Sequence, residues 1–290
     1  MAKTTRLDLL RAKEEGRKLV VVTAYDYSIA RLVDAAGVDA ILVGDSLGNV
    51  IQGHESTLPV TLEHMIYHTA CVQRARPSAQ VVADLPFGTF QRGAAAALDA
   101  SIRLVQESGA EAVKIEGGGP RVAAVEAVAH ADIPVWGHLG LTPQSVHAFG
   151  GFRVQGKQAE AARRIREEAR RLESAGACAL VLECVPHDLA SEITRSLQIP
   201  TIGIGAGPGC DGQVLVFHDL LGFDLDFTPR FVKHYDSVGR SIPEALRRFA
   251  QEVRDGAFPT LEHSYGTVEE AGGGATPAGR DTRAKRAGRR

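Results

Sequence analysis

Four acidic residues each follow a short apolar run of the sequence. Asp45 follows ILVG, Asp84 follows QVVA, Glu116 follows AVKI and Glu183 follows LVL. A single acid in such a place would cap a helix or pair with a base. Four acids at corresponding places predict a shared site, and like charges that are brought together need a compensating cation.

The residue types at this predicted site favour a hard cation. All four side chains offer oxygen atoms, and no cluster of Cys or His lies beside them in the sequence, which favours Mg²⁺ or a similar ion over zinc. Magnesium in proteins is typically bound by one or two carboxylates, keeps water molecules and accepts substrate oxygens. We therefore expect a metal site that could bind a 2-oxo acid through its carboxylate and ketone oxygens.

Two basic side chains accompany the acids. Lys114 precedes Glu116 by two residues on the same expected strand, so both side chains should point to the same face. Lys114 could form a Schiff base, hold a substrate carboxylate, or simply pair with an acid; we favour an electrostatic role because several acids that could hold an ion lie nearby. His138, in GHLG at the end of another apolar run, is either a substrate contact or a buried core histidine.

Two further motifs do not predict a catalytic or cofactor site. The segment GIGAGPGCDG contains GxGxxG at Gly207, Gly209 and Gly212, but neither a helical pattern nor a suitably spaced acid follows, which argues against a dinucleotide site. Such a loop could still bind an anion. Cys184 follows Glu183 directly, and alternation along a strand predicts that it points away from the face that carries Glu183.

Short apolar runs alternate with amphipathic stretches along the chain, a pattern typical of parallel strands joined by helices in an α/β fold. An open, doubly wound sheet would also alternate, but eight runs favour a closed (β/α)8 barrel, a TIM barrel in which catalytic groups gather at the carboxyl ends of the strands. We predict a single barrel domain over residues 1–265. The expected strands are Leu19 to Thr23, Ala40 to Val43, Gln80 to Ala83, Ala112 to Ile115, Val135 to Gly137, Leu180 to Leu182, Thr201 to Ile204 and Val214 to Phe217.

A repeated pattern supports this alternation. AAGVDAILVGD, SGAEAVKIE and AGACALVLE each read as a helix end, a glycine, a strand and an acid, so Gly37, Gly109 and Gly176 are expected at positive φ where a helix ends. Helical spacing of apolar residues predicts the faces that pack on the barrel. These sets are Ile29, Leu32, Val33 and Ala36; Leu98, Ile102 and Val105; Ala162, Ile165, Ala169 and Leu172; and Leu189, Ile193 and Leu197.

Composition excludes several classes of protein. A net charge of -2 over 290 residues gives no general attraction to nucleic acid or to anionic lipid. The four cysteines form no CxxC pair, the amino-terminal residues are polar, and no run of about 18 apolar residues occurs, so a cytoplasmic protein with reduced thiols and no membrane partner is expected. Residues 266–290 are rich in Gly, Ala and Arg and are predicted to form a disordered basic tail, solvated rather than bound to RNA or to a phosphorylated partner.

Several segments resemble the ketopantoate hydroxymethyltransferase family over roughly residues 5 to 265. They are VTAYDYSIA, LVGDSLGNVIQGHESTLPVT, ADLPFGTF, AVKIEGG, GHLGLTPQSVHAFGGFRVQG, LVLECVP and IPTIGIGAGPGCDGQVLVFHDLLG. The resemblance implies a barrel of the phosphoenolpyruvate/pyruvate superfamily with a single Mg²⁺ in each subunit. It also implies transfer of a hydroxymethyl group from 5,10-methylenetetrahydrofolate to 3-methyl-2-oxobutanoate, which gives 2-dehydropantoate for pantothenate and coenzyme A synthesis.

The resemblance also implies roles for individual residues. Asp45, Asp84 and Glu116 match the family's metal site; Ser46, Lys114 and His138 are expected to contact substrate together with Asp45 and Asp84; and Glu183 matches the general base that forms an enolate stabilised by the metal ion. A homo-oligomer, in the family a decamer, is implied as well. The alternatives are a Mg²⁺-dependent C–C lyase of the same superfamily acting on a small 2-oxo or 2-hydroxy acid, and an inactive barrel used as a scaffold. An inactive barrel would be expected to lack one of the four acids, and all four are present.

Overall fold

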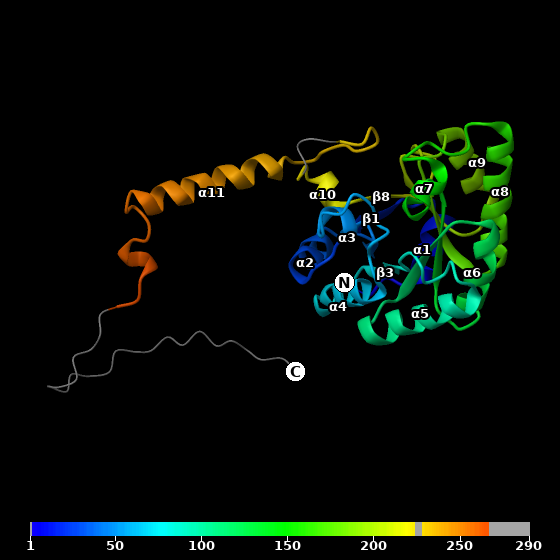
Figure 1. Cartoon of the computed structure of the whole chain (residues 1–290), viewed down its shortest axis with the longest axis horizontal. Coiled ribbons are helices and arrows are strands. Elements are labelled where there is room, and N and C mark those ends of the chain that lie inside the picture. Colours follow the sequence, from blue (N-terminus) through cyan, green and yellow to red (C-terminus); the bar gives the residue numbers. More distant parts are fainter. Residues whose placement is uncertain (1, 224–227, 267–290) are drawn as a thin grey trace. The chain divides into compact units, whose positions relative to one another are not determined.

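The computed structural model describes residues 2–223 and 228–266. Eight parallel strands form a closed barrel in sequence order, because β1 pairs with both β2 and β8. Figure 1 shows the strands enclosed by helices such as α5, α6 and α8. This confirms the predicted (β/α)8 barrel. The strands are β1 (Leu19–Thr23), β2 (Ala40–Val43), β3 (Gln80–Asp84), β4 (Ala112–Glu116), β5 (Val135–Gly140), β6 (Ala177–Glu183), β7 (Thr201–Ile204) and β8 (Gly212–Leu215).

Helices connect most of the strands. The α-helices are α1 (Arg6–Glu14), α2 (Tyr27–Ala35), α3 (Leu47–Val50), α4 (Leu62–Arg74), α5 (Ala94–Ser108), α6 (Val122–Ala129), α7 (Val146–Phe149), α8 (Ala159–Ser174), α9 (His187–Ser196), α10 (Phe217–Leu220) and α11 (Val238–Arg254). Short 3-10 turns lie at Gly119–Arg121, Pro143–Ser145 and Leu261–His263.

The predicted inner faces of α8 and α9 are confirmed, since all seven apolar residues predicted for them are buried, including Leu197 directly after α9. The predicted faces of α2 and α5 are partly wrong. Leu32 and Ile102 are exposed, and α5 buries its small residues together with Leu104. A helix with Ala and Ser on one side can approach its neighbours closely, so a search for large apolar residues finds the wrong side of it.

The predicted glycines at the helix ends are confirmed, but one strand-to-strand connection lacks a helix. Gly37, Gly109 and Gly176 have φ values of 76°, 78° and 95°, as expected at helix ends. No helix separates β7 from β8, and a glycine-rich loop joins them directly. A Cβ on Gly207 or Gly209 of this loop would collide with α9. Close packing therefore explains these glycines without a bound anion.

The last strand is shifted from its predicted position. The sequence predicted a strand from Val214 to Phe217, but β8 ends at Leu215 and α10 begins at Phe217. The backbone N–H of Phe217 donates to Thr23 Oγ1 at the end of β1, at 3.0 Å. This hydrogen bond turns the chain away from the sheet and brings α10 to the rim of the barrel.

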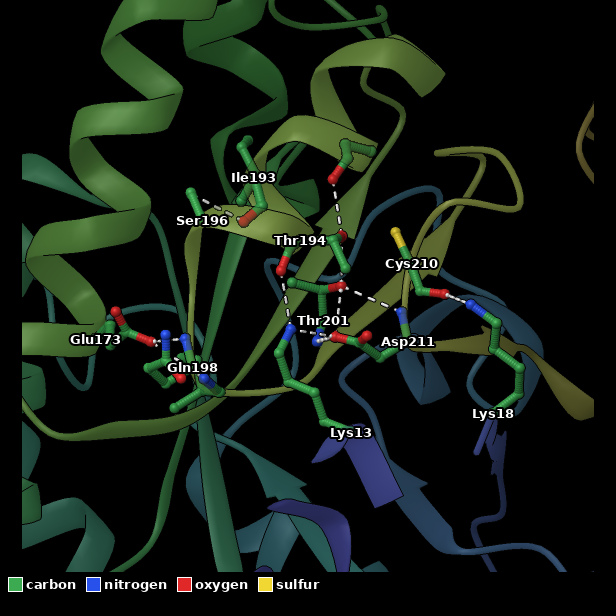
Figure 2. A network of polar contacts seen from close by, with 12 residues as sticks. Lys13, Lys18, Glu173, Ile193, Thr194, Ser196, Gln198, Thr201, Cys210 and Asp211 are labelled. Carbon is green, nitrogen blue, oxygen red and sulfur yellow. Dashed lines mark hydrogen bonds and ion pairs between the residues drawn. The ribbon is translucent and has the colours of Figure 1, made fainter. Parts of the chain in front are cut away.

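The amino-terminal end of the barrel is closed by α1. Leu9 and Ala12 of α1 pack with interior residues of the strands, including the fully buried Trp136. Lys13 fastens the same helix, because its Nζ lies 2.7 Å from Asp211 Oδ2 and donates to the carbonyl of Thr194 at 2.8 Å. Asp211 Oδ2 also accepts the backbone N–H of Thr201 at the start of β7, as Figure 2 shows. The cavity of the barrel opens at the opposite rim, at the carboxyl ends of the strands.

The described part of the chain divides into two units, with the boundary between residues 241 and 242. All eight strands belong to the first unit. α11 buries none of its side chains. Across the described residues, no helix combines the length and the apolar character needed to cross a bilayer. The predicted basic tail lies, after Gly266, outside the described residues.

Candidate active site

A cavity of about 970 Å³ lies at the carboxyl ends of the strands. All four acids named from the sequence line it, although they are separated by up to 138 positions in the chain (183 minus 45). Its wall also includes the predicted Ser46, Lys114 and His138, and an apolar rim formed by Phe152, Val154, Phe223 and Phe231. The structure therefore brings together every predicted site residue.

Lys114 is the centre of the charged cluster. Its Nζ lies 3.1 Å from Asp84 Oδ1 and 3.6 Å from Glu116 Oε1, and its side chain is 4% exposed. The predicted common orientation of Lys114 and Glu116 is confirmed. Burial alone would lower the pKa of Lys114, but Asp84, Glu116 and Asp45 outweigh burial and raise it. A protonated amine is a cation and not a nucleophile, so this environment favours the electrostatic role over a Schiff base.

The three buried acids differ in the direction of their pKa shifts. Burial and the nearby Glu116 and Asp84 raise the pKa of Asp45 well above its usual value. Burial also raises the pKa of Asp84, even though Lys114 opposes this shift. Burial acts in the same direction on Glu116, but Lys114 and His138 outweigh it, and the pKa of Glu116 is lowered. Three carboxyl groups thus share one lysine, and the cluster would gain from a further cation.

Gln144 organises these acids and was not found from the sequence. Its backbone N–H donates to Glu116 Oε2 at 3.0 Å, while its Nε2 donates to Asp45 Oδ2 at 2.8 Å and to the carbonyl of Leu85 at 2.9 Å. It lies in the segment LTPQS that follows β5. No spacing rule singles out a glutamine that reaches an acid 99 positions away.

Glu183 is placed apart from the buried cluster. Its side chain is 15% exposed, against 3 to 4% for the side chains of Asp84 and Glu116. His138 lies between the two groups, with Nε2 3.2 Å from Glu183 Oε2 and Nδ1 3.5 Å from Glu116 Oε1. Burial lowers the pKa of His138, but the two carboxylates outweigh burial and raise it. Of the four acids predicted from the sequence, Glu183 is therefore the one that a bound molecule reaches most easily.

The backbone around Glu183 is tightly constrained. Its carbonyl accepts the N–H of Leu141 at 2.8 Å, and Gly140, at a φ of 97°, passes so close that a Cβ there would collide with the same carbonyl. Cys184 also lines the cavity, so the prediction that it points away is wrong. Its φ of 47° ends the regular alternation of β6 directly after Glu183.

Other polar side chains also line the cavity, among them Ser46, His218, Asp219 and Arg230, and Tyr25 contacts two of these residues. Ser46 Oγ lies 2.8 Å from the hydroxyl of Tyr25, which is 1% exposed. Tyr25 and His218, which also lines the cavity, were not identified as site residues from the sequence. Tyr25 lies in VTAYDYS and His218 in VFHDLL, but nothing in these segments shows that their side chains meet at one rim.

The donor atoms of the cluster decide whether it suits a metal ion. Across residues 2–223 and 228–266, no three His, Cys, Asp or Glu side chains are grouped as a metal site. Glu116 is instead engaged by Lys114, His138 and Gln144, so direct ligation by Asp45, Asp84 and Glu116 together stays a prediction. Asp84 Oδ1 is buried, and its partner is Lys114 Nζ at 3.1 Å. Asp45 and Asp84 supply only oxygen donors, which fits Mg²⁺.

Fold and site together define a (β/α)8-barrel enzyme with a charged cluster at its carboxyl-terminal mouth. The fold is shared with a phosphonopyruvate hydrolase solved with oxalate and Mg²⁺, at 16% identity and a TM-score of 0.58, covering 90% of this chain and 93% of that one. It is also shared with a 2,3-dimethylmalate lyase of the PEP mutase/isocitrate lyase superfamily, at 19% identity and a TM-score of 0.58, covering 88% and 86%. At these identities the likeness concerns the fold alone.

Sequence comparison identifies the family. The ketopantoate hydroxymethyltransferase family model matches residues 3–261. The chain is 57% identical to 3-methyl-2-oxobutanoate hydroxymethyltransferase of Trichlorobacter lovleyi, covering 91% of this chain and 98% of that protein, and 54% identical to the enzyme of the same name from Pelobacter propionicus, covering 91% and 97%. The chain belongs to the ketopantoate hydroxymethyltransferase family and is an enzyme of the transferase class. The resemblance noted in the sequence is confirmed.

Proposed function

We propose that this enzyme transfers a hydroxymethyl group from 5,10-methylenetetrahydrofolate to 3-methyl-2-oxobutanoate and forms 2-dehydropantoate, a step towards pantothenate and coenzyme A. The observation that carries the proposal is the position of Glu183. It is a partly exposed carboxylate at the edge of a buried cluster of acids that share one lysine. Family membership supports the same reaction.

The substrate is proposed to bind beside the buried cluster. Lys114 would attract the carboxylate of the oxo acid, and Ser46, held by Tyr25, would donate a hydrogen bond to it. Asp45 and Asp84 would hold one Mg²⁺ in each subunit. When bound, that ion would act as a Lewis acid towards the ketone and carboxylate oxygens of the substrate, a contribution typically of several kcal/mol.

Glu183 would then act as the general base. Its carboxylate accepts the proton from C3 of the oxo acid, and the electron pair left behind attacks the incoming one-carbon unit. His138 holds Glu183 from its other side, since its Nε2 lies 3.2 Å from Glu183 Oε2. The one-carbon unit enters at the oxidation level of formaldehyde, so the reaction needs no redox partner.

The cavity offers room for the second substrate. Its volume of about 970 Å³ lies at the upper end of the range usual for sites that enclose drug-sized molecules. Its rim carries Phe152, Phe223 and Phe231, which provide an apolar surface for a flat ring. A small oxo acid alone would leave most of this space to water.

The direct test is product formation. Purified protein is incubated with both substrates and MgCl₂, and 2-dehydropantoate is measured by mass spectrometry. We expect product in the presence of Mg²⁺ and none after treatment with EDTA. Absence of product with Mg²⁺ would refute the proposed activity, and turnover that survives EDTA, with borohydride trapping at Lys114, would show a Schiff-base route instead.

A further inference from the structure

The strand ends differ in the side chains that they present to the cavity. The four acids predicted from the sequence, Lys114 and His138 come from the carboxyl ends of β2 to β6 or from residues directly after them. The ends of β7 and β8 contribute Ile204, Val214 and Val216 instead. Directly after β8, α10 brings His218 and Asp219 to the cavity wall, and Arg230 also lines this side.

The ring of His218 is held by aromatic neighbours on several sides. Its centroid lies 4.8 Å from that of Phe223, 5.7 Å from Phe217 and 5.8 Å from Tyr25. The hydroxyl of Tyr25 in turn contacts Ser46, which lies on the substrate side of the cavity. This packing fixes the direction of the imidazole in a way that a histidine exposed on a surface loop would not show.

The surroundings of His218 favour a neutral ring. Its Nδ1 is buried and has no hydrogen-bond partner among the described residues. Burial lowers the pKa of His218, although Asp26 opposes this shift. A second proton would leave a buried N–H without an acceptor, which costs free energy. A neutral ring that keeps its unpaired lone pair at Nδ1 carries its proton on Nε2, and there the ring can act as a donor.

We propose that His218 is a further catalytic residue, a hydrogen-bond donor to the oxygen atom that becomes the hydroxyl of the product. The assignment rests on the proposed function. The four predicted acids and Lys114 would surround the oxo acid at the ends of β2 to β6, so the one-carbon unit would approach from the side of β7, β8 and α10, where His218 lies. A neutral histidine with a lowered pKa is a known means of polarising a carbonyl group in a barrel enzyme.

The chemistry balances without another reactant. Water adds to the methylene carbon of 5,10-methylenetetrahydrofolate, both C–N bonds break, the two nitrogens end as N–H groups, and formaldehyde and tetrahydrofolate result. The electron pair at C3 then forms a bond to the formaldehyde carbon, and the π electrons of the carbonyl move to its oxygen. His218 stabilises this developing charge, and the oxygen finally takes up one proton, which matches the proton that Glu183 removed from C3.

Two reactions of the same enzyme separate this role from the others. Exchange of the C3 hydrogen of 3-methyl-2-oxobutanoate with D₂O, measured with Mg²⁺ and without folate, requires the base but not the one-carbon acceptor. Formation of 2-dehydropantoate requires both, with either 5,10-methylenetetrahydrofolate or formaldehyde as the donor. A donor to the product oxygen affects only the second reaction.

The variant His218→Phe keeps a ring against Tyr25, Phe217 and Phe223 but removes the N–H. We expect C3 exchange within about 3-fold of wild type, and product formation lower by about 100- to 1,000-fold, the usual loss when one oxyanion donor is removed. His218→Gln, which offers an amide N–H, should recover part of this loss. Recovery distinguishes a donor from a residue that only fills space.

Other outcomes of these experiments would overturn the assignment of His218. Unchanged product formation in His218→Phe would overturn the assignment, as would an equal loss in exchange and in product formation, because that pattern indicates a damaged oxo-acid site. His218→Gln and the urea unfolding curves of both variants show whether the fold is retained. If wild-type enzyme exchanges C3 but forms no product from either donor, the proposed transfer itself is wrong, whatever the variants do.

Discussion

Replacing Lys114 by methionine removes the one lysine of the buried cluster while it keeps most of the side-chain volume. Its Nζ lies 3.1 Å from Asp84 and 3.6 Å from Glu116, and its side chain is 4% exposed. Removal of one partner from a buried ion pair costs about 3 to 5 kcal/mol. A shift of one pKa unit corresponds to about 1.4 kcal/mol, so this penalty equals a rise of about 2 to 4 units in carboxyl pKa. The carboxyl groups should therefore bind a proton, which avoids part of the penalty.

The loss in Lys114→Met should therefore depend on pH. Without the lysine, the carboxyl pKa values in the folded state lie above those of the unfolded chain. The protonated cluster is then favoured at low pH, and stability falls as pH rises through the folded-state pKa values. In urea unfolding with EDTA, the free energy of unfolding of Lys114→Met should lie slightly below that of wild type at pH 5. At pH 8 it should be lower by the full penalty.

A matched control is available on the surface. Lys157 is exposed, so Lys157→Met should change the free energy of unfolding by less than about 0.5 kcal/mol at either pH. Equal stability of Lys114→Met and wild type at pH 8 would refute the reasoning, and so would a deficit that does not change between pH 5 and pH 8.

Three other variants test separate parts of the structure. Gly140→Ala forces a Cβ towards the carbonyl of Glu183 at a φ of 97° and should lower the free energy of unfolding by at least about 1 to 3 kcal/mol; wild-type stability in urea would contradict that strain. Asp45→Asn removes a carboxyl group whose pKa is raised by burial and by two neighbouring acids. The EDTA-treated variant should therefore be more stable than wild type at pH 8, while its turnover with Mg²⁺ should be lower by about 100-fold or more. Loss of stability with retained turnover would argue against a metal role. Lys13→Met removes the contacts to Asp211 and Thr194 and should cost about 1.5 to 3 kcal/mol in urea unfolding without changing KM; an unchanged unfolding curve would show that α1 is not held by this network.

The strands and their terminal acids were predictable because both follow from local patterns. A strand buried on both faces needs a continuous apolar run, and β1, β2 and β7 have the predicted bounds. Parallel strands of a barrel end at one rim, so acids that follow such runs meet in space. Asp45, Asp84, Glu116 and Glu183 were found in this way although no two are adjacent in the sequence.

The remaining features depend on contacts that no local pattern records. Cys184 reaches the cavity because its φ is positive, which breaks the alternation used to exclude it. The end of β8 is set by a hydrogen bond to Thr23 of β1, almost the full length of the barrel sequence away. Gln144 and His218 became site residues only when loops after β5 and β8 were placed around the mouth. A sequence pattern identifies the strand ends, but it does not identify the side chains from later loops that line the mouth of the barrel beside them.

Proton removal from carbon by Glu183 is the central step of the proposed mechanism. The decisive measurement is the rate at which the C3 hydrogen of 3-methyl-2-oxobutanoate exchanges with D₂O, followed by NMR with Mg²⁺ and without folate, in wild-type enzyme and in Glu183→Gln. We predict exchange by the wild type and a rate lower by about 100- to 10,000-fold in the variant, the range usual for loss of a general base. Equal exchange rates in the two proteins would show that another group removes the proton.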